Sequence, residues 1–401
     1  MEKSASSSKK KKGLKRNGHK IFLLSLCNTI ILLFLSYVLN NQSLFTGEDL
    51  NQYAWMELVK EKVGLSEQID YKDALFINVA YDKQLIEKND ELGMPVGNVD
   101  ITDRTKLLEL LNLLTETNRY RYVILDVRFE KGFYSGVDSA LFAKIKDMDR
   151  VVFANHKDIE LADSTLLGKA AINDYASTIV ATNFARYKFI HSGQPSLPLY
   201  VYHDLTGKTI KKHGLFYSCN GKLCKNSLFL RFPTDGFPEY DEKGNKTYYN
   251  LGNDILTNYS KNELATLTKD KLVFIGDMVE DVHDTYSGLK PGSIITYHAL
   301  RSLLEDEHLV SYGLMFFLAV MFFMISLSLF NKESIIKRIP IIRNTKSKVL
   351  LFLISFIGYA FVMSLVVSAL YLFFDRSISV LIPSLYFSIQ KTIIDYKRMK
   401  I

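Results

Sequence analysis

The chain has 401 residues, of which 48% are hydrophobic and 23% are charged, and this composition excludes a wholly disordered or low-complexity protein. The formal net charge of +7 equals the charge of the first 20 residues, where eight Lys and Arg residues accompany one Glu. Because the remaining residues sum to zero, the charge disfavours a basic nucleic-acid-binding fold, and we expect no nucleic-acid partner.

Four segments are candidates for membrane-spanning helices. Segment 21–39 is uncharged, is just long enough to cross a hydrocarbon core of about 30 Å, and lacks the small-residue cleavage site of a signal peptide. Two further uncharged runs, 312–330 and 349–374, also predict spans. Segment 378–394 is weaker because it is short and contains Gln390, so a helix on the membrane surface is its alternative.

Three basic clusters set the expected orientation: the tail 1–20, the loop 331–348 and the tail 395–401. The positive-inside rule places all three in the cytoplasm, so segment 40–311 is expected outside and 378–394 is expected to cross as a fourth span. The sequence therefore predicts a multi-pass protein of the cytoplasmic (inner) membrane, in contact with membrane lipid and carrying one large outer domain.

The outer segment alternates between strand and helix. Four short apolar runs predict buried strands at 74–80, 122–127, 151–154 and 271–276. Thr102 and Asp138 are each expected to cap a helix with a helical repeat of apolar residues, so two helices lie between these strands, and this order favours a parallel sheet covered by helices. The segment 172–259 is rich in Gly, Asn and aromatic residues and predicts a β-rich insertion of hairpins. The expected fold class is an α/β outer domain with α-helical transmembrane segments.

Two cysteines of the outer segment, Cys219 and Cys224, bracket an Asn-Gly pair between stretches that are typical of strands. A four-residue loop would set their side chains opposite each other, and an oxidising compartment would join them, so we expect a disulfide. Two free thiols are the alternative. Trp55 is expected to pack a helix against the domain, with an anchor in the membrane interface as its alternative.

A further helix is expected from Ser293 to Glu305, and it could run on into the span 312–330. It is the only expected element that joins the sheet edge directly to the membrane helices. The Pro291 and Gly292 pair that precedes it is the expected hinge.

Aspartates mark one edge of the expected sheet. Asp82, Asp126 and Asp277 each lie at or just after the C-terminal end of a strand, where open α/β sheets place ligands, and Asp281, His283 and Asp284 follow closely. Strand-end aspartates also commonly cap loops and helices, which is the alternative. The sequence has no Gly-rich phosphate loop, nucleophile elbow or HExxH motif, so we expect a non-catalytic ligand pocket without metal or cofactor. A metal-dependent hydrolase is a minor alternative.

The motif order resembles the second type of CHASE domain, the extracytoplasmic sensor of bacterial cyclases and histidine kinases. The family's closing signature is a strand ending in Ile-Gly, an Asp before a short loop, a Pro-Gly pair and a His-Ala. This sequence matches it with Ile275-Gly276, Asp284, Pro291-Gly292 and His298-Ala299. One span before the domain and three after it also fit the family, although its Pro-Trp-rich turn after the first strand is missing.

The resemblance implies a sensor that binds a small ligand outside and passes its state through the membrane. No kinase or cyclase domain follows the last expected span, so we expect a separate effector protein as partner. The ligand residues expected from the sheet edge and from the resemblance are Asp82, Asp126, Asp277, Asp284 and His298. A packed helix residue is the alternative for His298, and a structural or accessory subunit is the alternative for the whole chain.

Overall fold

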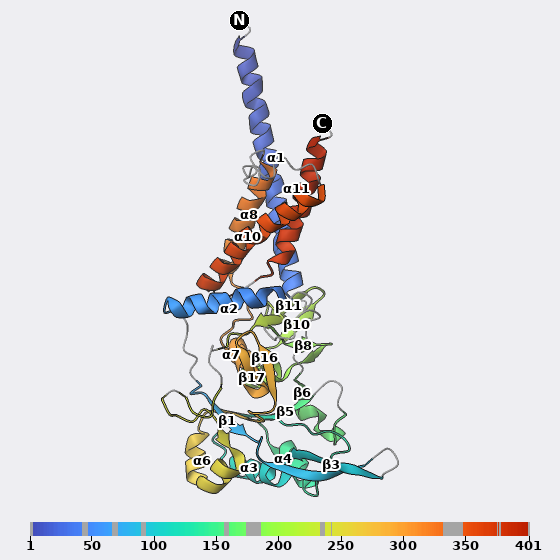
Figure 1. The fold of residues 1–401 in the computed structure, drawn as a ribbon, viewed down its shortest axis with the longest axis vertical. Helices are drawn as coiled ribbons and strands as arrows, with labels where there is room; N and C mark the ends of the chain where they lie inside the picture. The colour runs from blue at the N-terminus through green and yellow to red at the C-terminus, as the bar shows by residue number, and fades with distance from the viewer. Residues whose placement is uncertain are drawn as a thin grey trace.

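The computed structural model describes residues 3–41, 47–65, 71–89, 94–155, 160–173, 186–232, 237–241, 243–331, 348–374, 376 and 378–399. The molecule is elongated, with a bundle of long helices at one end and an α/β domain at the other (Figure 1). Helix α1 (Lys3–Asn40) begins, and helix α11 (Leu381–Met399) ends, at the end of the bundle that is remote from the domain.

The domain is built on a six-stranded sheet in which every strand pairs in parallel with its neighbours. In sheet order the strands are β14 (Tyr249–Asn250), β1 (Ala74–Asn78), β15 (Leu272–Gly276), β4 (Tyr122–Asp126), β5 (Val151–Asn155) and β6 (Ala170–Ile172). The four strands expected from apolar runs are confirmed, as is the parallel sheet with helices. The two short outer strands, β14 and β6, were not expected.

Helices cover both faces of this sheet. The face remote from the bundle carries α3 (Arg104–Thr117), α4 (Asp138–Asp147) and α6 (Lys261–Leu267), and the other face carries α5 (Leu197–Thr206) and α7 (Gly292–Leu304) (Figure 1). Alternate strand residues supply the two cores: Val123 and Leu125 of β4 pack towards α3, whereas Tyr122 and Ile124 pack towards α7. The two helices expected between the first strands, α3 and α4, are confirmed.

The caps of these two helices differ from expectation. Asp103, not Thr102, is the N-cap of α3, and its carboxylate accepts hydrogen bonds from the N–H groups of Thr105 and Lys106 at 3.0 and 3.1 Å. Asp138 is the first residue of α4, and it accepts a hydrogen bond from the Ser135 N–H at 2.8 Å.

Small sheets make up most of the remaining domain. The insertion contains a three-stranded antiparallel sheet, β10 (Ile210–His213), β11 (Phe216–Cys219) and β12 (Lys222–Cys224). Four two-stranded pairs are β2 (Lys83–Asn89) with β3 (Pro95–Thr102), β7 (Arg186–Lys188) with β13 (Ser227–Phe229), β8 (Ile190–His191) with β9 (Gln194–Pro195), and β16 (Val282–Thr285) with β17 (Gly288–Pro291). A 3₁₀ helix η2 (Ser164–Lys169) precedes β6, and a π-helix η3 (Leu251–Leu256) follows β14.

One segment expected to form hairpins is a helix instead. The aromatic run after Ser196 forms α5, with Pro198 in its first turn and Gly207 ending it at a φ of 68°. Leu197, Val201 and Tyr202 are buried in the core beneath α7. The burial of this helix face in the tertiary structure outweighs the preference of its aromatic residues for strands.

The expected disulfide between Cys219 and Cys224 is not formed, and both are buried free thiols. The loop between β11 and β12 has two residues rather than four, so Cys219 pairs with Lys222 and Cys224 pairs with Tyr217. The cysteines are diagonal neighbours on one face, which places them about 7 to 8 Å apart, beyond the Cα separation that a disulfide bridges without backbone movement. The expectation that the loop sets them opposite each other is wrong.

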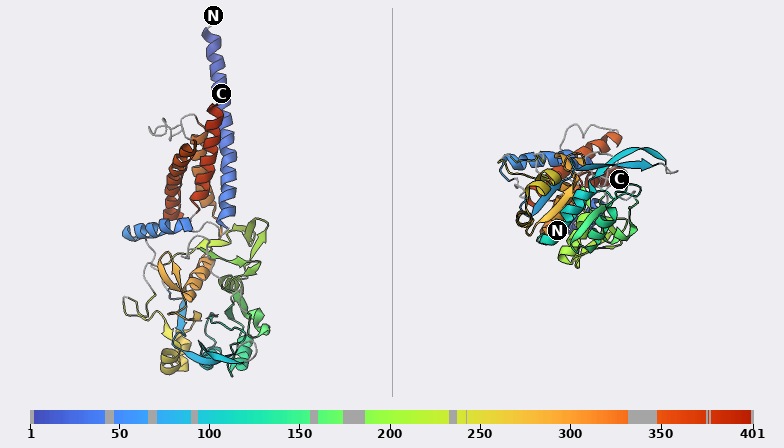
Figure 2. Two further views of the ribbon diagram at one scale, coloured as in Figure 1. Left: turned by 45° about the vertical axis from the view of Figure 1, so that its right-hand side comes forward. Right: turned by 90° about the horizontal axis from the view of Figure 1, so that it is seen from below.

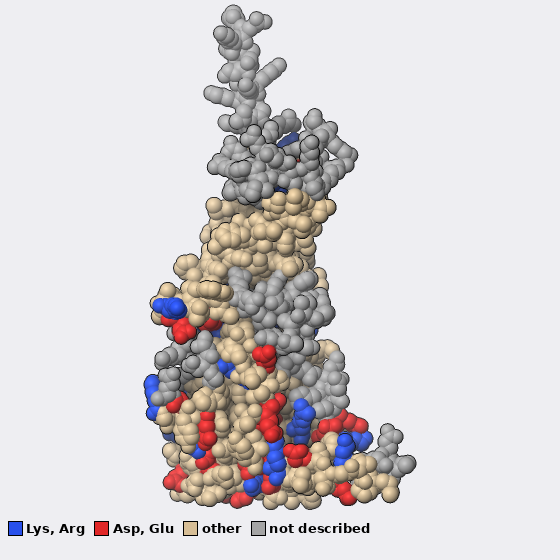
Figure 3. Space-filling view, in the orientation of Figure 1, with Lys and Arg blue, Asp and Glu red and all other residues tan. Residues whose placement is uncertain are grey.

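Among the described residues, three helices are long and apolar enough to cross a membrane: residues 18–40 of α1, α8 (Tyr312–Phe330) and residues 352–374 of α10 (Lys348–Phe374). They run alongside α11 in the bundle (Figure 2). On the face seen in Figure 3 the middle of the bundle is uncharged, whereas charged side chains are scattered over the domain. These findings indicate a membrane protein. The loop expected at 331–348 falls largely at 332–347, outside the described residues.

Two expectations about the membrane junction are wrong. Helix α7 ends at Leu304 and does not continue into α8, because a turn follows it and Ser311 caps α8 by accepting the Leu314 N–H. Helix α2 (Gly47–Lys62) lies across the end of the bundle nearest the domain, where Met56 packs on Tyr371 (Figure 1). Trp55, on α2, is 68% exposed and therefore does not pack against the domain.

Candidate functional site

The carboxyl edge of the sheet holds a group of polar side chains around Asp126, the last residue of β4. Asn173, which follows β6, donates a hydrogen bond from Nδ2 to Asp126 at 3.0 Å, and Ser293 of α7 donates from Oγ at 3.2 Å. Thr296 of α7 and Tyr187 of β7 both donate to Oδ1 of Asn173, at 3.4 and 3.2 Å. The sheet, the insertion and α7 therefore meet at one carboxylate, which we call the Asp126 site.

Gly276 makes this close approach possible. It ends β15, beside Asp126 in the sheet register. A Cβ atom at position 276 would lie 2.4 Å from Ser293 Oγ and 3.0 Å from the Asp126 Cβ, so a larger residue would displace the Ser293 hydroxyl from Asp126.

The surroundings of Asp126 favour its neutral form. Burial raises its pKa to about 7, and the negative charge of Asp281 adds to this effect, while hydrogen bonds from Asn173 and Ser293 oppose it. Asp281 also pairs with His283, at 3.3 Å between Oδ1 and Nε2. The site thus contains a carboxyl group that changes charge near neutral pH, next to a second carboxylate and an imidazole.

Asp82 and Asp277 lie at the same edge but have partners within the chain. Asp82 is buried and accepts hydrogen bonds from Lys106 Nζ at 2.6 Å and from the Gly252 N–H at 3.0 Å. Although burial alone raises the pKa of Asp277, hydrogen bonds from the Glu280 N–H and from Lys83 hold it below its usual range. Both carboxylates therefore fit the capping and pairing alternative.

Asp284 and His298 are placed apart from the Asp126 site. Asp284 is exposed on β16. His298 is buried in the core among Tyr71, Tyr297 and Phe232, and its Nε2 lies 3.2 Å from the Tyr71 hydroxyl. Burial lowers the pKa of His298 to about 3, and neighbouring cationic side chains lower it further, which fits the packed-residue alternative.

The structure also adds residues that the sequence analysis did not select. Asn173 and Ser293 bind Asp126 directly, and the available signals were weak: a polar residue after the short apolar run at 170–172, and a serine at the start of a helix. Pro291 is the N-cap of α7 and Gly292 is its first residue, and both are buried. Their role as a hinge stays a prediction.

Chemically, the Asp126 site is a network of internal hydrogen bonds that converges on a carboxyl group of adjustable charge. Such a network can respond to a bound proton or ligand through the charge on Asp126. Across the described ranges, no group of three or more His, Cys, Asp or Glu side chains lies close enough to hold a metal ion.

Comparisons of the chain with models of protein families, with curated proteins and with solved structures each find no match.

Proposed function

We propose that the chain is a membrane-anchored, sensor-like protein. Its domain binds a ligand or partner at the Asp126 site, and α7 passes the state of that site to the membrane helices and then to a separate effector protein. The resemblance of the motif order to CHASE domains of the second type supports a sensory role. The observation that carries the proposal is the position of α7, which reaches from the Asp126 site towards the bundle.

The first turns of α7 are bound to the site. Ser293 donates to Asp126 and Thr296 donates to Asn173, so a change in the charge or occupancy of Asp126 alters the hydrogen bonds that hold this end of the helix. The side chains of this helix are otherwise packed in the core, so it moves as a body rather than by bending.

The turn that follows α7 is bound to the membrane module through Glu307. One oxygen of this carboxylate accepts hydrogen bonds from Arg231 at 2.6 Å and from Arg376 at 3.1 Å. Arg376 lies between α10 and α11, so a shift of α7 is transmitted to the outer ends of both helices. Coupling between two such sites typically amounts to about 1 to 3 kcal/mol, set by the difference in ligand affinity between the two states.

We further propose that α11 is a fourth span, with both termini in the cytoplasm and the domain outside the cytoplasmic membrane. The basic tails and the basic segment 332–347 support this orientation. A polar network supports the assignment of α11 as a span. Asn28 of α1 accepts hydrogen bonds from Tyr386 and Gln390 of α11 at 2.7 and 2.6 Å, and donates one to Ser326 of α8 at 2.8 Å. Hydrogen bonds of this kind between the side chains of neighbouring helices are typical of a membrane interior.

A structural or accessory subunit is the second candidate. The lysine partners of Asp82 and Asp277 favour it, because they close much of the sheet edge without any ligand. The two candidates differ in one respect: only a sensor requires the Asp126 site to be coupled to the bundle.

Electron paramagnetic resonance with spin labels tests this coupling. Nitroxides are placed at Leu289 of β17 and Tyr312 of α8, which are 61% and 94% exposed, in the full chain with its three cysteines replaced by alanine and reconstituted in lipid. Protons serve as the probe, because a change from about pH 8.5 to about pH 5.5 neutralises Asp126. We expect the label distance to change in the parent protein, to stay constant in Asp126→Asn, and to change normally in the exposed control Asp284→Ala.

A label distance that is independent of pH in the parent, or one that still responds fully in Asp126→Asn, would favour the accessory subunit. The charges of Asp281 and His283 act on Asp126, so both residues are left unchanged in every variant.

A further inference from the structure

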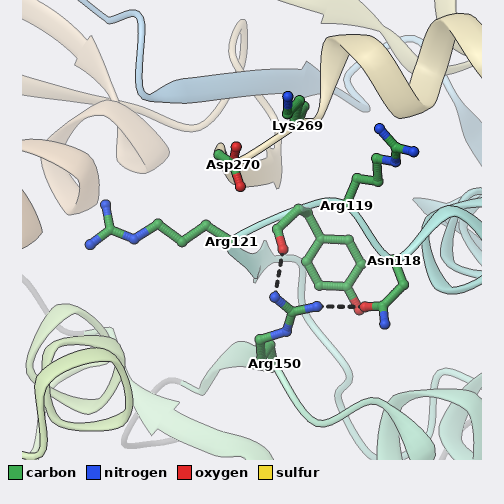
Figure 4. Close-up of a pocket in the computed structure, with 7 residues that line it drawn as sticks. Asn118, Arg119, Arg121, Arg150, Lys269 and Asp270 are labelled. Atoms are coloured by element: carbon green, nitrogen blue, oxygen red, sulfur yellow. Dashed lines mark hydrogen bonds between the residues drawn. The ribbon is translucent and has the colours of Figure 1, made fainter.

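A second polar feature lies at the opposite edge of the sheet, where β4, β5 and β15 begin. It is a pocket of about 440 Å³ formed by the loops after α3, before β5 and after α6 (Figure 4). Four cationic side chains line it, Arg119, Arg121, Arg150 and Lys269, together with one acidic side chain, Asp270. The formal charge of the lining is therefore +3.

Arg150 is held in place by the pocket wall. Its guanidinium donates to the Tyr120 carbonyl oxygen at 2.8 Å and to the Asn118 side chain, and it lies 4.9 Å from the centre of the Tyr120 ring (Figure 4). An arginine fixed in this way presents its remaining N–H donors in a set direction, so little conformational entropy is lost when it binds an anion.

The other three cations are available to a ligand. Arg119, Arg121 and Lys269 are exposed, and they have no ion-pair partner in the part of the chain that the structure describes. Figure 4 shows Arg119 and Arg121 extending to opposite sides of Arg150, with Lys269 across the pocket. Their nearness to the C-terminal ends of α3 and α6 makes each cation tolerable, because the helix dipole is negative there. The helix dipole does not explain why separate loops place these cationic side chains around the same pocket.

We propose that this pocket binds the phosphate group of an anionic ligand. A phosphate monoester carries a charge of about −1.5 to −2 at neutral pH, which suits a lining of +3 better than a single carboxylate does. Arginine is also the side chain whose planar fork of donors matches phosphate oxygens.

The position of the pocket excludes one source of the phosphate, the lipid headgroups of the membrane. The pocket belongs to the layer of α3, α4 and α6, at the end of the molecule farthest from the bundle (Figure 1). Headgroups of the membrane that the bundle crosses are therefore out of reach. The phosphate belongs to a small soluble compound or to a phosphate-bearing polymer.

Isothermal titration of the full chain in detergent, at low ionic strength, tests the proposal with two probes, pyrophosphate and long-chain polyphosphate. We expect at least one probe to bind, and we expect the double variant Arg119→Ala/Arg121→Ala to weaken that binding by roughly tenfold or more. Both side chains are exposed, so the variant is expected to fold normally. The charge-matched control is Lys211→Ala/Lys212→Ala on β10, where both side chains are also exposed.

Binding of pyrophosphate supports the proposal and indicates a small soluble ligand. Binding of polyphosphate alone supports it and indicates a polymer, since only a chain then gains enough contacts. The absence of binding by either probe would overturn the proposal, and so would an equal loss of binding in the β10 control, because that result would show general charge attraction instead of a site. Neither result depends on coupling between the Asp126 site and the membrane.

Discussion

Replacement of Asp126 by Asn is expected to stabilise the protein above neutral pH. The asparagine keeps the geometry of the site, because its oxygen still accepts the Asn173 hydrogen bond and its amide still reaches the Ser293 hydroxyl. It removes only the charge that burial and Asp281 make unfavourable. The change therefore isolates the electrostatic cost of the site from its packing.

The magnitude follows from proton binding. The pKa of Asp126 is raised from 3.8 to about 7, so between these pH values the folded protein holds a proton that the unfolded chain has released. The stability that this proton confers is complete below about pH 4 and is lost as the pH rises to about 7. The full difference corresponds to about 4 kcal/mol, and the partial exposure of the side chain reduces the expected gain to about 2 to 4 kcal/mol.

Thermal unfolding of the full chain in detergent, followed by circular dichroism, measures this gain. Near pH 4 the variant and the parent should unfold at similar temperatures, and above pH 7 the variant should unfold roughly 2 to 7 °C higher. Asp284→Asn, on exposed β16, is the matched control and should show no such difference. An Asp126→Asn variant that is less stable than the parent at pH 8 would refute the argument that the charge is unfavourable.

Three further changes have defined outcomes. Glu307→Gln leaves the two arginines at the membrane junction without their shared carboxylate and should cost about 3 kcal/mol, measured as a lower unfolding temperature; an unchanged temperature would contradict the pairing. Alkylation under denaturing conditions without reductant should modify both Cys219 and Cys224, and an intact mass showing neither thiol modified would restore the disulfide. Asn28→Leu should weaken the bundle by about 1 to 2 kcal/mol in detergent unfolding, whereas the lipid-facing control Ile30→Leu should not, and equal effects would argue against the polar network.

Local patterns predicted the central part of the fold. The runs that became β1, β4, β5 and β15 are apolar on both faces and therefore stand out in the sequence, as buried parallel strands do. Strand β14 escaped prediction because its two residues pair only with β1, from a segment far along the chain. Helix α5 escaped because its aromatic residues favour strands until they are buried beneath α7.

The candidate site was predictable only in part. The position of Asp126 follows from a strand ending at a sheet edge, which is a local signal. Its partners Asn173 and Ser293 come from 47 and 167 residues away, so no spacing in the sequence connects them. Asp82 and Asp277 carry the same local signal as Asp126. Only the tertiary positions of Lys106 and Lys83 show that these two carboxylates are paired with a lysine, whereas Asp126 is not.

The measurement that tests the central claim most directly is cysteine accessibility in intact cells, because sensing through this domain requires the domain to lie outside. Single cysteines at Asn245, Thr345 and Ser7, in the cysteine-free background, are exposed to a thiol reagent that does not cross membranes. We expect labelling at Asn245, an exposed residue of the domain, and none at Thr345 or Ser7 until the cells are opened. Labelling of Ser7 in intact cells, with Asn245 protected, would contradict the orientation and the sensory role that depends on it.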